Sequence, residues 1–201
     1  MRHFASIAIA ALVVGVAAIG ASVSAADEPA HTVVLTDGNF EIRDYPPLTI
    51  AEVTVRAPRS DAGNAGFRKL AGYIFGGNEG GKKFEMTAPV IEARAGGADA
   101  KGRDREAWTI RFVMPAGATL AAMPKPNDPD IRMVEAPAAR YAVMRYAGYA
   151  DDNATETATQ DLGATMAKRG LHAAGPPLIA QYNPPWIPGF MRRNEIMIPI
   201  R

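Results

Sequence analysis

The sequence contains no cysteine among its 201 residues. Disulfide bonds therefore cannot support the fold, and thiolate nucleophiles and thiolate metal ligands are excluded. Attachment to a lipid through a cysteine after the N-terminal apolar run is excluded for the same reason. Stability must come from a hydrophobic core, and the chain is long enough to bury one as a single domain.

Histidine is also scarce, with only His3, His31 and His172. A zinc site needs three or four converging ligands, and the sequence has no His-x-x-His or His-Glu-x-x-His pattern. It also lacks the Gly-x-Ser-x-Gly elbow of many hydrolases. The glycine-rich run 76–81 has no Gly-Lys-Ser/Thr ending and follows a predicted helix, which is typical of a helix cap rather than a phosphate loop. The sequence therefore predicts that the protein is not an enzyme, with Glu85, Glu92 and Glu195 as the carboxylates that a hydrolase alternative would use.

Neither sign of charge dominates, since 22 Lys and Arg stand against 21 Asp and Glu. Residues 1–26 combine a short basic start, an apolar run over 4–23 and small residues at 23–26, as in a secretory signal peptide. Cleavage after Ala25 or Ala26 would leave residues 27–201 with no net charge, so nothing indicates a nucleic acid or an anionic membrane as partner. We expect a periplasmic or secreted protein. An uncleaved membrane anchor is the alternative, because the apolar run is just long enough to cross a bilayer.

The remaining chain repeats one order of elements: a strand, a proline-marked turn, a strand, a helix and two more strands. Alternating β-branched residues predict the strands, and apolar residues at helical spacing predict the helices. This predicts an α+β fold in which pseudo-symmetric duplicated ββαββ units form a distorted antiparallel β-barrel with two helices. We place His31 in a frayed N-terminal tail and an unstructured loop at 96–105. The first unit has strands at 40–47, 48–55, 83–93 and 107–114 and a helix at 61–75; the second has strands at 131–137, 140–146, 178–182 and 195–200 and a helix at 154–169.

The run 182–195 is rich in proline and aromatic residues. Prolines fix the backbone, so the segment is a stiff loop rather than a helix. Trp186 and Phe190 have few local neighbours in such a loop and must pack elsewhere. Either the loop is the wall of a binding site or it closes the core. We expect Arg193, Asn194 and Glu195 to form a hydrogen-bonded network that holds it.

Four motifs together give the chain a resemblance to the SOUL family of haem-binding proteins. They are Phe40–Tyr45, Tyr73–Asn78, Met86–Val90 and Tyr182–Trp186 with Arg192–Glu195. They occur in the family's order and span about residues 32–201. The resemblance implies a pseudo-symmetric, barrel-like α+β domain, similar to the effector domains of some bacterial regulators. It also implies binding of haem or a related tetrapyrrole.

The resemblance further implies a site between the first helix and the C-terminal loop, without a strong axial iron ligand. The family's basic positions align near Asn64, Gly72 and Ile187, none of which is basic, so Arg68, Lys69, Arg192 or Arg193 would have to replace them. His172 is the remaining candidate for an iron ligand, since imidazole commonly binds haem iron. The predicted ligand-binding residues are Phe67, Arg68, Ala71, Tyr73, Trp186, Phe190 and Arg192.

Three functions are compatible with these features. The first is an exported carrier or buffer that binds haem weakly and without a covalent bond. The second is a binding module for another apolar small molecule. The third is a protein–protein interaction module of the cell envelope with Trp186 and Phe190 as anchors. If the protein binds haem, we expect a change in the Soret band. If it binds another small molecule, we expect thermal stabilisation without colour, and if it binds a protein partner, we expect neither.

Overall fold

The computed structural model describes residues 26–96 and 107–201. Almost all of the predicted signal peptide, and all but Gly96 of the predicted loop at 96–105, lie outside these ranges. The strands form one antiparallel sheet in the order β1-β2-β7-β9-β8-β4-β5-β3-β6. The elements are β1 Thr32–Asp37, β2 Phe40–Tyr45, β3 Leu48–Arg56, α1 Arg59–Ile74, β4 Val90–Arg94, β5 Ala107–Val113, η1 Leu120–Ala122, β6 Arg132–Ala136, β7 Ala139–Ala147, α2 Asp152–Lys168, β8 Leu178–Gln181, η2 Gly189–Met191 and β9 Arg193–Ile200.

The sheet has the predicted internal symmetry. Apart from β1, its strand order reads the same in both halves outward from the central β8–β4 pair. The first strand of each unit pairs with the other unit, because β2 pairs with β7 and β6 pairs with β3. The strands on either side of each proline turn are therefore not partners of each other. The two units are interlocked, and the barrel-like α+β prediction is confirmed.

Two predictions about the first half of the chain are wrong. Residues 32–37 form β1, which pairs with β2, and the His31 ring lies 4.9 Å from the Tyr45 ring, so His31 is not in a frayed tail. The strand predicted at 83–93 is shorter, since β4 begins at Val90. The residues before it are held by other contacts: Phe84 stacks on Tyr73 at 5.8 Å, and the Thr87 hydroxyl donates to the Val113 carbonyl. Both predicted helices are present within two residues of their expected bounds.

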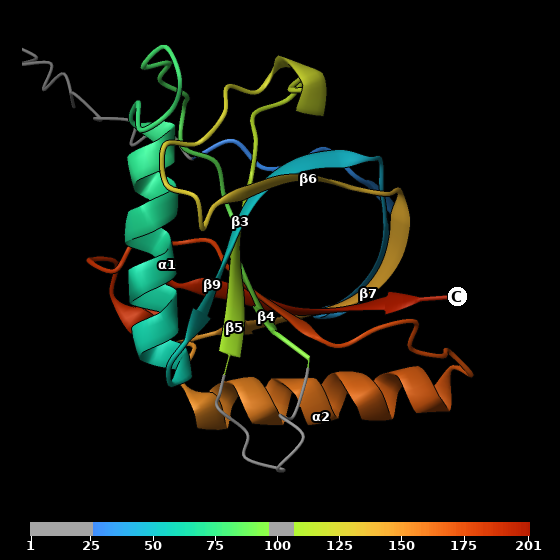
Figure 1. The fold of residues 1–201 in the computed structure, drawn as a ribbon. Helices are drawn as coiled ribbons and strands as arrows, with labels where there is room; N and C mark the ends of the chain where they lie inside the picture. Colours follow the sequence, from blue (N-terminus) through green and yellow to red (C-terminus); the bar gives the residue numbers. More distant parts are fainter. Residues whose placement is uncertain (1–25, 97–106) are drawn as a thin grey trace, which may run out of the picture.

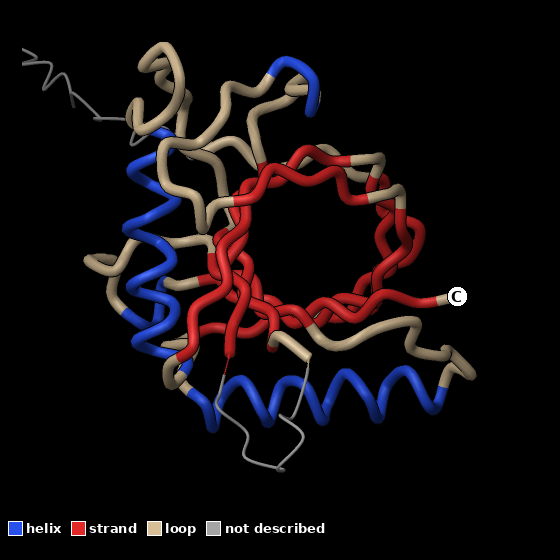
Figure 2. The backbone as a smooth tube through the Cα atoms, viewed as in Figure 1, coloured by secondary structure: helices blue, strands red, loops and turns tan. Residues whose placement is uncertain are grey.

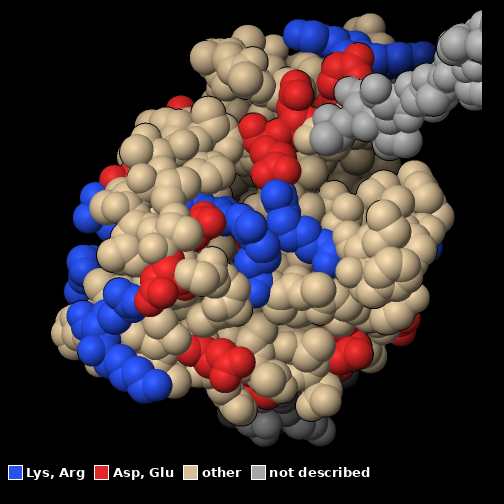
Figure 3. Space-filling view, turned by 180° about the vertical axis from the view of Figure 1, so that it is seen from behind, with Lys and Arg blue, Asp and Glu red and all other residues tan. Residues whose placement is uncertain are grey.

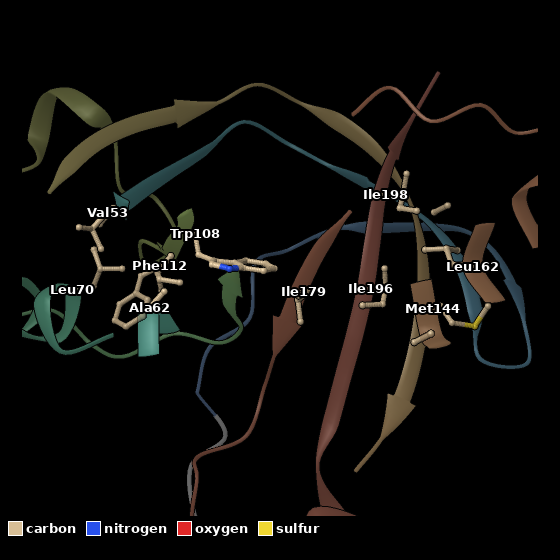
Figure 4. Close-up of a cluster of buried hydrophobic side chains, with 14 of the residues drawn as sticks. Val53, Ala62, Leu70, Trp108, Phe112, Met144, Leu162, Ile179, Ile196 and Ile198 are labelled. Carbon is tan, nitrogen blue, oxygen red and sulfur yellow. The ribbon is translucent and has the colours of Figure 1, made fainter. Parts of the chain in front are cut away.

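Figures 1 and 2 show the strands curling into a ring with both helices outside it. Helix α1 packs on β3 and β5, and α2 packs on β7 and β9. Alternate strand residues turn outward to meet the helices, as the two-residue period of a strand requires. In Figure 4 the labelled side chains of this core run from the α1 side, with Leu70 and Phe112, to the α2 side, with Leu162 and Met144. Neither of the two described helices is long and apolar enough to cross a membrane.

The other set of strand residues faces the inside of the curl and forms a second apolar cluster. Its buried members include Tyr45, Ile91, Val113, Val143 and Met197. The sheet thus buries apolar side chains on both faces. Only the outer face is covered by helices, and the inner face lines the space within the curl.

Candidate ligand-binding sites

The C-terminal loop between β8 and β9 is held in one shape by its own polar groups. Arg192 donates from Nε to the Ile187 carbonyl at 2.7 Å and from Nη2 to the Pro185 carbonyl. The backbone N–H of Arg193 donates to Asn183 Oδ1 at 2.6 Å. The Arg193 bond belongs to the network predicted from Arg193, Asn194 and Glu195, whereas the two Arg192 bonds were not predicted. They also mean that the Arg192 guanidinium is already engaged by backbone carbonyls.

This loop docks on the connection between β7 and α2. Gly148 N–H donates to the Gly189 carbonyl at 3.1 Å, and Asn194 donates to the Gly148 carbonyl at 2.9 Å. A Cβ atom at Gly189 would lie 2.6 Å from the Tyr149 ring, so glycine permits this close approach. The Arg192 guanidinium lies 4.7 Å from the centre of the same ring, within the range of a cation–π contact.

Docking leaves an exposed apolar surface, which we call the aromatic cluster: Tyr149, Trp186, Phe190 and Met191. Trp186 is 78% exposed and Phe190 is 83% exposed. Large apolar side chains gathered on a rigid loop are typical of a binding surface, whereas single exposed apolar residues are common and carry no such meaning. Trp186 and Phe190 therefore do not cover the core, which was one of the two alternatives for this loop.

The predicted helix residues divide between surface and core. Phe67 is 40% exposed and packs edge-on against Phe112 at 5.4 Å, and Arg68 is exposed on the same helix. Ala71 is half-buried. Tyr73 is only 1% exposed and donates its hydroxyl to the Pro124 carbonyl at 3.0 Å, so it belongs to the core.

The N-terminus of α1 lies beside the loop that carries Tyr149, because Arg59 donates to the Ala150 carbonyl. Phe67 follows Arg59 by about two helical turns, or about 12 Å along the axis. The helix positions and the aromatic cluster therefore belong to the same side of the fold.

Two of the basic residues considered as replacements already have carboxylate partners. Lys69 donates to Asp128 at 2.7 Å, and Arg193 donates to Glu28 at 2.5 Å. Hydrogen bonds to carboxylates of the 128–130 segment raise the pKa of Lys69, so it stays charged. Among the described residues, Arg68 has no hydrogen bond or ion pair, which leaves it as the free cation of the four.

His172 is separated from these residues. It is exposed in the loop after α2, and its carbonyl accepts from the Arg201 N–H at 3.3 Å. The aromatic cluster lies at the other end of this helix, whose 17 residues span about 25 Å. One ligand cannot contact both the aromatic cluster and His172. Within the described ranges, no three His, Cys, Asp or Glu side chains are placed to hold a metal ion together.

A cavity of about 380 Å³ lies inside the curled sheet. Leu48, Ile50, Val113 and Met197 line its walls, and Tyr45 lies among them. The volume is within the usual range of ligand pockets. This cavity was not predicted from the sequence, although the apolar residues on both faces of β3 are a signal that its inner face is also shielded from solvent.

A buried ion pair connects β2 and β9. The carboxylate of Glu195, which is 0% exposed, accepts from Arg43 Nη1 at 2.8 Å and Nη2 at 3.0 Å. The Tyr182 hydroxyl donates to it at 2.7 Å. Burial alone would raise the pKa of Glu195, but the hydrogen bonds from Arg43 and Tyr182 outweigh it and hold that pKa below its usual value. A carboxylate held in this way is a structural group, as expected for the predicted network and not for the acid or base of the hydrolase alternative.

Charges on the molecular surface are mixed in sign. Figure 3 shows Lys and Arg side chains next to Asp and Glu side chains over the face opposite to that of Figure 1. This agrees with the near balance of the two signs in the sequence.

Comparison with known proteins gives one family match and several similar folds. The model of the family described as SOUL heme-binding protein matches residues 26–199. No curated protein matches the sequence. The crystal structure of the EcmrR C-terminal domain is 13% identical, with a TM-score of 0.58 over 81% of this chain and 96% of that one. The crystal structure of a hydrolase from Listeria innocua is 11% identical, with a TM-score of 0.56 over 84% and 94%. EcmrR within a DNA complex, at 13% identity, has a TM-score of 0.59 over 81% of this chain and 57% of that one. At these identities the structures share the fold alone.

Proposed function

Because this chain belongs to the SOUL heme-binding protein family, we propose that it is an exported, non-catalytic tetrapyrrole-binding protein that holds haem without a covalent bond. The observation that carries the proposal is the aromatic cluster, a rigid and exposed apolar surface beside the N-terminus of α1. Its flat side chains suit the face of a macrocycle. Export rests on the signal-like pattern of residues 1–26.

The residues present fit a tetrapyrrole held by its faces and edge. Trp186, Phe190 and Met191 would cover the ring, Phe67 would extend the apolar contact along α1, and Arg68 would pair with a propionate. Bound haem would add an iron centre and its absorption band. Neither His31 nor His172 lies in the aromatic cluster, so the apolar contact has to carry most of the binding.

The expected affinity is modest. Covering a few hundred Å² of apolar surface contributes about 5–10 kcal/mol, while association costs about 4–15 kcal/mol. Binding that is micromolar or weaker follows, which suits a carrier or a buffer that must release its ligand. A tightly ligated redox centre would need a stronger iron ligand. The non-catalytic part of the proposal rests on this argument.

Hemin titration followed by absorbance tests the proposal. We expect a saturable change in the Soret band with the unaltered protein. The double variant Trp186→Ser/Phe190→Ser should bind hemin at least about tenfold more weakly, because burial of a large apolar side chain contributes about 1.5–3 kcal/mol. The matched control is Leu120→Ser, which removes an exposed apolar side chain from η1 and should leave the titration unchanged.

The absence of a saturable change at tens of micromolar hemin would contradict haem binding. If thermal stabilisation by a colourless apolar compound were then lost in the double variant, the same surface would bind another small molecule. If neither ligand bound, a protein partner would be the remaining use of the aromatic cluster.

The position of His172 leads to a separate prediction. Replacement by alanine should leave hemin affinity and the Soret band unchanged, because the side chain lies about 25 Å from the aromatic cluster. The same titration measures this. Loss of the band in His172→Ala would mean that haem binds at the C-terminal end of α2 and that the aromatic cluster is not the site.

A further inference from the structure

The inner cavity ends at a group of three charged side chains that is not neutral. Glu52 accepts from Arg111 Nε at 2.9 Å and from Arg132 Nη2 at 2.7 Å. One carboxylate thus faces two guanidinium groups, which leaves one positive charge. Glu52 is buried while Arg132 is largely exposed, so the group of three side chains extends from the cavity wall to the protein surface.

Arg111 is the member placed to meet a ligand. It lines the 380 Å³ cavity and also a second cavity of about 460 Å³. Tyr141 and Leu178 are shared by the two cavities as well, so the spaces adjoin. Arg111 uses Nε for Glu52, and no hydrogen bond of the described residues uses its two terminal nitrogens. Those nitrogens can donate in the paired geometry that a carboxylate accepts.

The rest of the cavity is suited to a hydrocarbon body. Ile50, Val113 and Met197 supply buried apolar walls, and Leu48 and Val134 supply partly buried ones. The other acidic lining residue, Glu135, is exposed beside Pro137, and Glu52 is neutralised by its two arginines. The lining is therefore apolar in its middle and has its excess positive charge at the Arg111 end.

From this arrangement we propose that the inner cavity is a second ligand site, separate from the aromatic cluster, and that it binds an amphipathic monocarboxylate. The apolar chain would lie against Ile50, Val113 and Met197, and the carboxylate would accept from the terminal nitrogens of Arg111. An amphipathic cation is disfavoured, because the only buried carboxylate among the described lining residues already has two partners.

Calorimetric titration with three probes of equal chain length tests this: decanoate, decanol and decyltrimethylammonium. Decanoate should bind the purified protein at least about tenfold more tightly than the other two, since a charge-assisted hydrogen bond is about twice as strong as a neutral one. Arg111→Met should remove that preference for decanoate, and Arg111→Lys should restore part of it. Arg140→Met is the matched control, because Arg140 pairs with Asp44 on β2 and does not line the cavity.

Methyl resonances of the methionines locate the bound probe. Met197 lines the cavity, whereas Met191 is in the aromatic cluster. Decanoate should shift the Met197 methyl resonance and leave that of Met191 in place. This readout does not depend on whether Arg111→Met folds. Leu48→Trp, which enlarges a side chain of the cavity wall, should abolish the shift.

Several outcomes would overturn the proposal. They are no binding of decanoate, equal binding of the cationic probe, or a shift of Met191 instead of Met197. Retention of full decanoate affinity in a folded Arg111→Met variant would do so too. None of these outcomes contradicts hemin binding at the aromatic cluster, which the hemin titration tests separately.

Discussion

Replacing Glu195 with alanine is expected to lower the free energy of unfolding by up to about 3–5 kcal/mol, because it removes the carboxylate that accepts from both terminal nitrogens of the buried Arg43 and leaves only Glu41, on Nε, as a carboxylate partner. Arg43 is 3% exposed and makes two hydrogen bonds to Glu195, so water cannot take the place of the carboxylate without opening the sheet. Urea unfolding measures the change. Asp44→Ala is the control, since the Asp44–Arg140 pair is exposed and screened and should contribute little.

The same carboxylate predicts how stability changes with pH. Its pKa is depressed in the folded protein, so its contribution is complete above the ordinary value of 4.5 and is lost as the pH falls through the folded value. Unfolding free energy of the unaltered protein should therefore fall below about pH 4.5, and Glu195→Gln should show a shallower fall. Equal slopes for the two proteins would contradict the role given to this ion pair.

Gly66→Ala is expected to destabilise the protein by about 1–3 kcal/mol through overpacking. Gly66 is buried in α1, and a Cβ atom there would lie 2.4 Å from Ile110 Cγ1 and 2.7 Å from Ile110 Cβ. Ile110 is itself 0% exposed on β5, so it has nowhere to move. Thermal unfolding should show a lower midpoint.

The control lies in the same helix. Gly72 is exposed, and an added Cβ atom would meet nothing within 4 Å. Gly72→Ala should therefore stabilise the protein by up to about 1 kcal/mol through helix propensity alone. If both substitutions changed stability in the same direction, the close approach of α1 to the sheet at Gly66 would not explain the effect of Gly66→Ala.

Much of the fold could be predicted from local patterns. The helical spacing of Leu70 and Ile74 and the duplicated strand order indicated both helices and the two units, and the structure has them. The exchange of β2 and β6 between units could not be predicted, because pairing depends on contacts far apart in the chain. Strand β1 could not be predicted either, because it is stabilised by its pairing with β2 and its own mostly exposed residues give only a weak strand signal.

The candidate site was predicted less completely. The stiffness of the C-terminal loop followed from its prolines, but the expectation that Trp186 and Phe190 pack against other residues was wrong, since both side chains are largely exposed. The role of Arg192 could not be predicted, because the sequence does not show that the carbonyls of Ile187 and Pro185 accept from its guanidinium. Tyr149 was missed since only the docking of Gly189 brings it to the surface cluster. The inner cavity could not be predicted, because it depends on the curvature of the whole sheet.

The measurement that tests the central claim most directly is the effect of ferric hemin on the methionine methyl resonances, since the paramagnetic iron broadens the signals of nearby groups. Met191 lies in the aromatic cluster, Met197 in the inner cavity, and Met166 is buried in α2. We predict saturable loss of the Met191 signal near one equivalent of hemin, with the Met197 and Met166 signals retained. Loss of the Met197 signal first, or no saturable loss at all, would contradict haem binding at the aromatic cluster.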